Sequence, residues 1–141
     1  MPVSIHFFYL KPCPDFRQRK KLKAFLPSLF KSEKKVLGSL NYIFCSDDYL
    51  LQINQEHLKH DYYTDIITFD LSASAKTVDG EIYISIDRVR ENARQEGVSV
   101  KEELHRVIFH GSLHLCGYKD KTQNEKSQMK KMENKYLKGY L

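Results

Sequence analysis

The pattern of apolar and polar residues predicts short strands interspersed irregularly with helices. Apolar runs rich in β-branched and aromatic residues predict four strands, at 3–10, 37–45, 64–71 and 80–86, with a loop over 72–80. Apolar residues at helical spacing predict five helices: from Asp15 onward, 47–58, 87–97, about 100–116 and about 122–138. Pro27 is expected to bend or shorten the first of them. Because these elements lack a regular βαβα alternation, we expect one α+β domain over residues 1–141, built around a small four-stranded mixed sheet.

The predicted helix at about 100–116 differs from the others because it is apolar on almost every side. Ser99 and Glu102 have the spacing of a capping box at its start, and Gly117 can end it in a left-handed conformation. We therefore expect this helix to be central and buried. His110 and His114 lie one turn apart at the edge of its main apolar stripe, so both imidazoles can reach one point.

The two histidines alone do not decide between two interpretations. Such a pair arises often by chance, and buried histidines are commonly hydrogen-bonded core residues. The rest of the motif favours a metal site, because Gly117 allows the chain to reverse and Asp120 follows within reach. Two imidazoles and one carboxylate with an open fourth position form a catalytic zinc arrangement. An iron oxygenase uses the same donor types, but there the carboxylate usually lies close to the first histidine.

The motif also differs from that of the metalloproteases. Its spacing follows the metzincin pattern HExxHxxGxxH, with Gly117 in register with the glycine. Gly111 replaces the glutamate that acts as general base, and Asp120 replaces the third histidine. In metalloproteases that glutamate takes a proton from the metal-bound water. Since no residue of this helix can do so, ordinary peptide hydrolysis is disfavoured.

The stretch HGSLHLCGYKD (110–120) resembles the HGxLHLxGYDH signature of the YbeY family of metal-dependent endoribonucleases. Similar segments follow the family order over roughly 37–138, notably 53–71 (with Asp61 among the retained residues) and 80–93. The resemblance implies a zincin-like fold in which His110, His114 and Asp120 bind one zinc ion, or nickel or another divalent metal. It also implies cleavage of single-stranded RNA in 16S ribosomal RNA maturation and ribosome quality control, with ribosomal RNA precursor and small-subunit proteins as partners.

Two positions depart from the family pattern. Asp120 stands where most members carry a histidine, which makes a bound metal a weaker Lewis acid. Leu58 stands where an arginine is expected, so the bidentate donor for a phosphate is missing, and Lys59 is a candidate to supply a point charge instead. Thr64 and Asp65 are candidate substrate contacts, or they cap the third strand.

Several other residues with reactive side chains have less specific positions. Glu81 is a candidate distal base but is more typical of a surface position at a strand start. Cys116 could bind a soft metal, although packing as a small apolar residue is the simpler interpretation. The remaining histidines are expected to be exposed or to support the site rather than bind the metal: His57, His60 and His105.

Charge and cysteine usage narrow the functional class. The formal net charge is +5 and the pI about 9.0, with basic clusters at 17–23 and 119–138, which favours a polyanion such as RNA or else a solvated helix face. Three cysteines without a CxxC pair indicate a reducing, cytoplasmic setting. Neither a signal peptide nor a membrane span is predicted. Two functions remain in competition: an endoribonuclease, and a non-catalytic ribosome-assembly factor with a structural metal.

Overall fold

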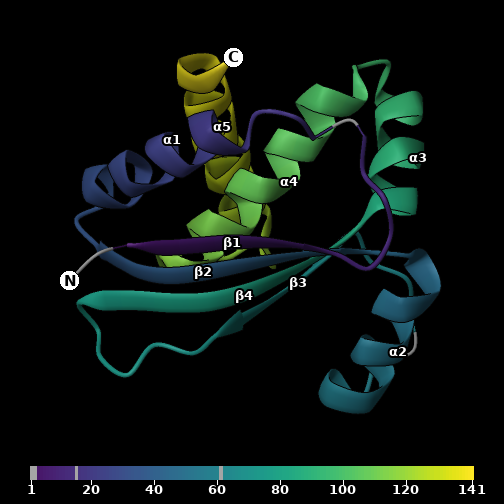
Figure 1. Cartoon of the computed structure of the whole chain (residues 1–141), viewed down its shortest axis with the longest axis horizontal. Coiled ribbons are helices and arrows are strands. Elements are labelled where there is room, and N and C mark those ends of the chain that lie inside the picture. The colour runs from purple at the N-terminus through teal and green to yellow at the C-terminus, as the bar shows by residue number, and fades with distance from the viewer. Residues whose placement is uncertain (1–2, 15, 61) are drawn as a thin grey trace.

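The computed structural model describes residues 3–14, 16–60 and 62–141, and the predicted start of the first helix at Asp15 lies outside them. Figure 1 shows the elements in chain order. The strands are β1 (Ser4–Tyr9), β2 (Val36–Cys45), β3 (Ile66–Asp70) and β4 (Thr77–Ser85). The helices are α1 (Arg19–Ser32), α2 (Asp47–Leu58), α3 (Ile86–Glu96), α4 (Val100–Leu115) and α5 (Gln123–Tyr140). The expected α+β composition is thereby confirmed.

The four strands form one mixed sheet in the order β1-β2-β4-β3. The first three of these strands are parallel, and β3 runs antiparallel to β4 at the edge. Tyr42 of β2 is paired with Phe7 on one side and with Ile82 on the other, and Ile82 is paired in turn with Thr68 of β3. This register places β3 at the sheet edge that α4 also contacts.

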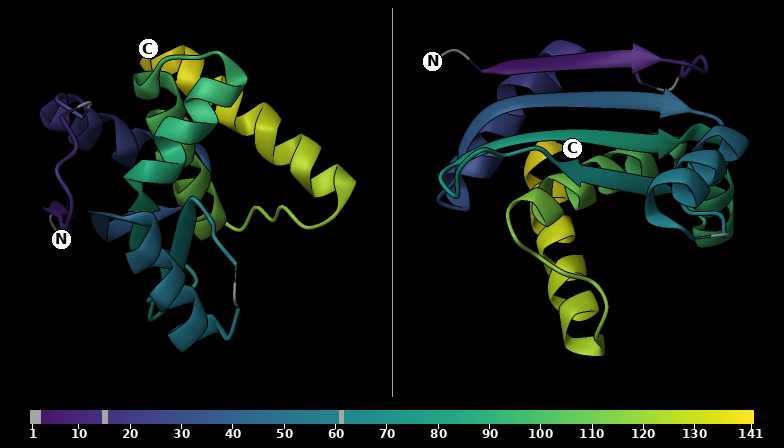
Figure 2. Two further views of the ribbon diagram at one scale, coloured as in Figure 1. Left: turned by 90° about the vertical axis from the view of Figure 1, so that its right-hand side faces the viewer. Right: turned by 90° about the horizontal axis from the view of Figure 1, so that it is seen from below.

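Helices cover the two faces of the sheet unequally. Figures 1 and 2 show α1, α4 and α5 on one face and α2 on the other. The main core lies under α4, where Leu104, Ile108 and Leu113 pack against the sheet. A smaller cluster lies under α2 and consists of Cys45, Leu50, Ile53 and Ile67. Among the described residues, no helix combines the length and apolarity needed to cross a bilayer.

The helix α4 is buried as its apolar composition predicts, and it contacts the sheet at Gly111. Its N-cap Ser99 accepts a hydrogen bond from the Glu102 backbone N–H, whereas the full reciprocal capping box occurs on α5, between Thr122 and Glu125. A Cβ atom at Gly111 would lie 2.9 Å from Ile66 Cδ1 and 3.1 Å from two carbons of Ile82. Glycine therefore allows α4 to lie directly on β3 and β4.

Three elements begin two or more residues away from their predicted starts. β4 begins at Thr77 rather than Gly80, because Thr77 and Val78 pair with Val36 and Leu37 of β2, a non-local contact that overrides the loop-like composition of 72–80. β3 begins at Ile66, so Thr64 and Asp65 precede it. Among the described residues α1 begins at Arg19, and it continues past Pro27 to Ser32 with its buried face intact.

Candidate metal centre

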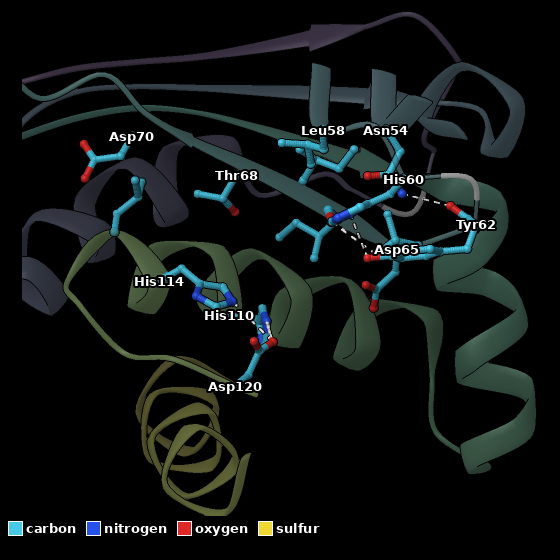
Figure 3. Close-up of a pocket in the computed structure, with 14 residues that line it drawn as sticks. Asn54, Leu58, His60, Tyr62, Asp65, Thr68, Asp70, His110, His114 and Asp120 are labelled. Carbon is cyan, nitrogen blue, oxygen red and sulfur yellow. Dashed lines mark hydrogen bonds and ion pairs between the residues drawn. The ribbon is translucent and has the colours of Figure 1, made fainter. Parts of the chain in front are cut away.

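The side chains of His110, His114 and Asp120 meet at one point, as Figure 3 shows. The two histidines lie on the last turns of α4, with ring centroids 4.6 Å apart. Asp120 Oδ2 is 3.1 Å from His110 Nε2 and 3.3 Å from His114 Nε2. All three side chains are partly exposed. The sequence spacing that suggested a common site thus corresponds to a close cluster with access to solvent.

The turn after α4 positions both Asp120 and His114. Gly117 has a φ of +108°, a conformation that favours glycine, and the Tyr118 N–H bonds to the Leu113 carbonyl oxygen at 3.0 Å. The chain therefore reverses and carries Asp120 back toward the helix. The carbonyl oxygen of Tyr118 lies 2.9 Å from His114 Nδ1 and accepts its hydrogen bond. With Nδ1 donating, the lone pair of Nε2 points to the cluster.

Glu133 of α5 holds the other imidazole. Its Oε2 lies 2.6 Å from His110 Nδ1, and its Oε1 accepts a hydrogen bond from Arg106 at 3.0 Å. Glu133 is only 7% exposed, so the carboxylate is a buried anion whose partners are a guanidinium and an imidazole. Burial by itself would lower the pKa of His110, but the hydrogen bond and charge of Glu133, with the charges of Asp120 and Asp65, raise it above its usual value.

The cluster fits a tetrahedral divalent metal in its donor types and spacing. Zinc–nitrogen and zinc–oxygen bonds of about 2.0–2.1 Å at tetrahedral angles place neighbouring donor atoms roughly 3.3 Å apart. The two separations from Asp120 Oδ2, 3.1 Å and 3.3 Å, match this spacing. The hydrogen bonds from both Nδ1 atoms are those that typically orient metal-binding histidines. This group could therefore hold a metal ion.

Two cavities meet at this cluster. The first has a volume of about 510 Å³ and is lined by His110, His114 and Asp120 together with residues of α2, β3 and the loop between them. The second, of about 550 Å³, shares His110 and Asp120 with the first and continues along α3, α4 and α5, where Lys126 and Lys130 line it. The cluster consequently lies between two open spaces rather than at the closed end of one.

Sequence and structure comparisons assign the chain to a family. A family profile described as Endoribonuclease YbeY matches residues 11–141. The chain belongs to the YbeY endoribonuclease family. It is 52% identical to Endoribonuclease YbeY of Cytophaga hutchinsonii over 95% of this chain and 94% of that protein. It is 46% identical to the Bacteroides thetaiotaomicron protein of the same name over 88% of this chain and 89% of that one.

A solved structure has a similar fold over most of the chain. The solution structure of TM1509 from Thermotoga maritima is similar, with a TM-score of 0.65 and 29% identity, over 96% of this chain and 87% of that one. The resemblance to YbeY proteins that the motif at 110–120 indicates is thus confirmed over most of the chain. Asp61, a residue that the segment 53–71 shares with the family pattern, lies outside the described residues.

The candidate substrate residues of this YbeY chain divide into two groups. Thr64 and Asp65 line the first cavity, as do Leu58 and His60, which were not predicted to contact substrate. Burial is the main cause that raises the pKa of the Asp65 carboxyl, and Asn92 Nδ2 lies 3.4 Å from its Oδ2. Lys59 is exposed at the C-cap of α2 and does not line this cavity, so the structure gives its proposed role as a substitute for the family arginine no support.

The other candidate residues lie away from the cluster. Glu81 and His57 line a separate cavity on the sheet face that carries α2. His105 is buried, and its Nδ1 donates to the Lys101 carbonyl oxygen at 2.7 Å. Burial raises the pKa of the Cys116 thiol to about 12, and Cys116 packs against the main core, in agreement with a packing role.

The sequence interpretation missed Glu133. The sequence does contain a signal for this residue, because Glu133 lies on the same face of α5 as four apolar or aromatic residues that are buried. These neighbours are Met129, Tyr136, Leu137 and Tyr140. A charged residue inside an apolar stripe is costly unless a buried partner is present, so its position predicts a partner even where the sequence does not identify it.

Proposed function

We propose that this YbeY chain is a metal-dependent endoribonuclease that cleaves single-stranded RNA during 16S ribosomal RNA maturation and ribosome quality control. The convergence of His110 Nε2 and His114 Nε2 on Asp120 Oδ2, at 3.1 Å and 3.3 Å, is the observation that carries the proposal. We place the site in a single zincin-like domain spanning residues 1–141. A role in ribosomal RNA maturation places the protein in the cytoplasm.

The metal, for which zinc is our first candidate and nickel the second, would be held by His110, His114 and Asp120. When bound, it supplies an acidified water and polarises the scissile phosphate. The rest of the site prepares the ligands. Glu133 and the Tyr118 carbonyl oxygen fix both imidazoles with Nε2 directed inward, so little reorganisation is needed on binding. The aspartate makes this centre less electrophilic than one with three histidines.

Gly111 occupies the position of the metalloprotease glutamate, so the proton acceptor must be a residue at another position. Asp65 is our candidate. It lines the cavity that contains the cluster, and its raised pKa makes the carboxylate a better base than an exposed aspartate. Thr64 lines the same cavity and is a candidate substrate contact through its hydroxyl group.

The two cavities on either side of the cluster favour internal cleavage over removal of terminal nucleotides. A strand that enters through the cavity beside β3 can leave along α5, where Lys126 and Lys130 are available to its phosphates. The same cavity is also lined by glutamates of α3, α4 and α5, namely Glu96, Glu102, Glu103 and Glu133. The contacts with the lysines are electrostatic, so RNA binding should weaken as the salt concentration rises. The YbeY names of the relatives describe endoribonucleases, which agrees with this open arrangement.

A non-catalytic assembly factor that binds ribosomal RNA and small-subunit proteins is the second candidate. One observation favours it: Leu58, where the family pattern has an arginine, lines the cavity and offers no donor to a phosphate. The solvent-accessible position of the cluster disfavours it, because structural zinc sites normally have all four positions filled by the protein.

Cleavage by the purified protein separates the two candidates. A single-stranded RNA spanning a precursor end of 16S ribosomal RNA is incubated with the protein as purified, after chelation, and after addition of zinc or nickel. The nuclease predicts internal cuts that are lost on chelation and restored by one of the metals, together with about one equivalent of that metal per chain by elemental analysis. Intact RNA in every sample, with unchanged RNA affinity, would favour the assembly factor.

A further inference from the structure

Two aromatic side chains stand exposed at the edge of the cavity that contains the metal cluster. His60 and Tyr62 belong to the loop between α2 and β3, and Figure 3 shows them across the cavity from His110 and His114. Their rings are stacked, with centroids 5.1 Å apart and planes inclined by 21°. The Tyr62 hydroxyl and His60 Nδ1 are 3.0 Å apart and share a hydrogen bond. The two rings therefore form one stacked pair.

The backbone of this pair is anchored by one buried residue. Asn54 of α2 is 2% exposed. Its carbonyl oxygen accepts a hydrogen bond from the His60 N–H at 3.0 Å, and its side-chain amide donates to the Tyr62 carbonyl oxygen at 2.9 Å. Because the backbones of both residues are hydrogen-bonded to the same buried residue, one through its main chain and one through its side chain, the two rings are positioned before any ligand arrives, which reduces the entropy lost on binding.

The core does not explain why these rings are held there. In the described part of the chain neither His60 nor Tyr62 belongs to a hydrophobic cluster, and Tyr62 is 56% exposed. The adjacent Tyr63 is different: its hydroxyl donates a hydrogen bond to Asp48 at 3.3 Å, and the Arg88 guanidinium carbon lies 5.4 Å from the centroid of its ring. Tyr63 is thus engaged by α2 and α3, whereas the neighbouring pair faces the cavity.

We propose that His60 and Tyr62 form a stacking platform for one nucleobase of the RNA, next to the phosphate presented to the cluster. This inference rests on the proposed nuclease function and specifies how its substrate is held. Every base has a π-face, so stacking on a preformed aromatic surface selects unpaired RNA without selecting sequence. The platform also gives a rationale for Leu58: apolar and aromatic side chains line this wall of the cavity, and the substrate is held by a base rather than by an arginine contact to phosphate.

The test compares Tyr62→Leu, which keeps an apolar side chain and loses the ring, with the full-length wild-type chain. The probe is a short single-stranded oligoribonucleotide that carries 2-aminopurine, or an abasic nucleotide, at each position in turn. Chelator keeps the RNA intact while affinity is measured. Tyr49→Leu is the matched control, because Tyr49 is 40% exposed on α2 and lines the cavity on the other face of the sheet.

We expect Tyr62→Leu to weaken binding by roughly 5- to 150-fold, the range for loss of one stacked base, and Tyr49→Leu to bind like wild type. In the wild-type protein, 2-aminopurine at one position should be quenched, and an abasic nucleotide there should cost the same factor. Tyr62→Leu should be indifferent to that abasic nucleotide, since the two changes remove one interaction. Tyr62→Phe retains the ring and should recover most of the affinity.

The platform is overturned if Tyr62→Leu binds intact RNA as tightly as wild type, or loses equal affinity for intact and abasic RNA at every position. If the wild-type protein cleaves RNA but binds every abasic RNA with the same affinity, the platform is rejected and the nuclease function is kept. If the wild-type protein quenches 2-aminopurine at one position on binding but never cleaves RNA, the platform is kept and the nuclease function is rejected. In the active enzyme, we expect Tyr62→Leu to raise KM more than it lowers kcat.

Discussion

Glu133 Oε2 accepts a hydrogen bond from His110 Nδ1 at 2.6 Å, so a residue of α5 sets the orientation of a residue of α4. Arg106 holds the second oxygen of the same carboxylate at 3.0 Å. The two helices pack side by side, and this buried contact is the polar link between their packing and the cluster. The centre therefore depends on tertiary structure well beyond the motif at 110–120.

The variant Glu133→Gln should weaken zinc binding by about 10- to 100-fold, the usual range when a residue that supports a ligating histidine is altered. The amide removes the negative charge that makes the imidazole a stronger donor. Competition with a chromophoric chelator measures the affinity. Glu56→Gln removes the same charge from an exposed position of α2 and serves as control. A folded Glu133→Gln protein with wild-type affinity would contradict this role.

The variant His114→Ala should abolish RNA cleavage and leave RNA affinity within about threefold of wild type, because binding is mainly electrostatic and stacking. Gel-based cleavage and fluorescence anisotropy give the two values. His57→Ala, an exposed histidine of α2 outside the cluster, should cleave normally. Parallel loss of cleavage and affinity in a folded His114→Ala protein would count against metal-dependent hydrolysis.

As the pH is lowered, the cleavage rate should begin to fall at a higher pH than it would if the base were an aspartate with an ordinary pKa. The folded-state pKa of Asp65 is raised by burial, so the carboxylate needed as a base is present above that pKa and is lost as the pH falls through it. Asp65→Asn should lower the rate by about 10²- to 10⁴-fold and remove this limb at saturating metal.

Asp70 provides the comparison for that experiment, because its carboxylate lines the same cavity. Asp70→Asn should retain the acidic limb. Rate–pH profiles of the wild type and the two variants, measured between pH 5 and 9, distinguish a base from a general charge effect. An acidic limb that survives in Asp65→Asn at an undiminished rate would remove Asp65 from the mechanism.

Glu103 should make the metal-free protein less stable as the pH rises. It is 8% exposed, and burial, with the charges of Asp65 and Glu133, raises its pKa from 4.5 to about 7. Between these values the folded state holds a proton that the unfolded state has released. The free energy of unfolding therefore decreases as the pH rises from about 4.5 to about 7 and then levels off.

The variant Glu103→Gln should remove this penalty and raise the free energy of unfolding at pH 8 by about 1–3 kcal/mol, with little change at pH 4.5. Urea denaturation at the two pH values measures the difference. Glu102→Gln, the neighbouring carboxylate, is the control. A stabilisation that is equal at both pH values would show that Glu103 is not the group responsible.

Much of the site was predictable because it is local in sequence. His110 and His114 are fixed relative to each other by one helical turn, and Gly117 determines how the chain returns to Asp120, so three residues could be brought together without knowledge of the fold. The helix α4 was equally predictable, since its apolar composition allows only a buried position.

The remaining features depend on contacts between distant segments. The first residues of β4 have the composition of a loop. Only their pairing with Val36 and Leu37 of β2 makes Thr77 and Val78 part of a strand. The link from Glu133 to His110 requires the packing of α5 against α4, which no short-range pattern encodes. Lys59 has a left-handed conformation at the end of α2, with φ +56°, and it does not line the cavity, a placement that the sequence pattern did not reveal.

The contact at Gly111 has a mechanical consequence for the whole centre. Both imidazoles are attached to a helix whose backbone at Gly111 lies directly against the methyl groups of Ile66 and Ile82. The distance between this helix and the sheet therefore fixes the position of both histidines. An added methyl group would press on the ends of the Ile66 and Ile82 side chains, so either these side chains or α4 would have to shift. A shift of α4 would carry His110 and His114 together, and it would move them relative to Asp120 and Glu133, which are anchored elsewhere.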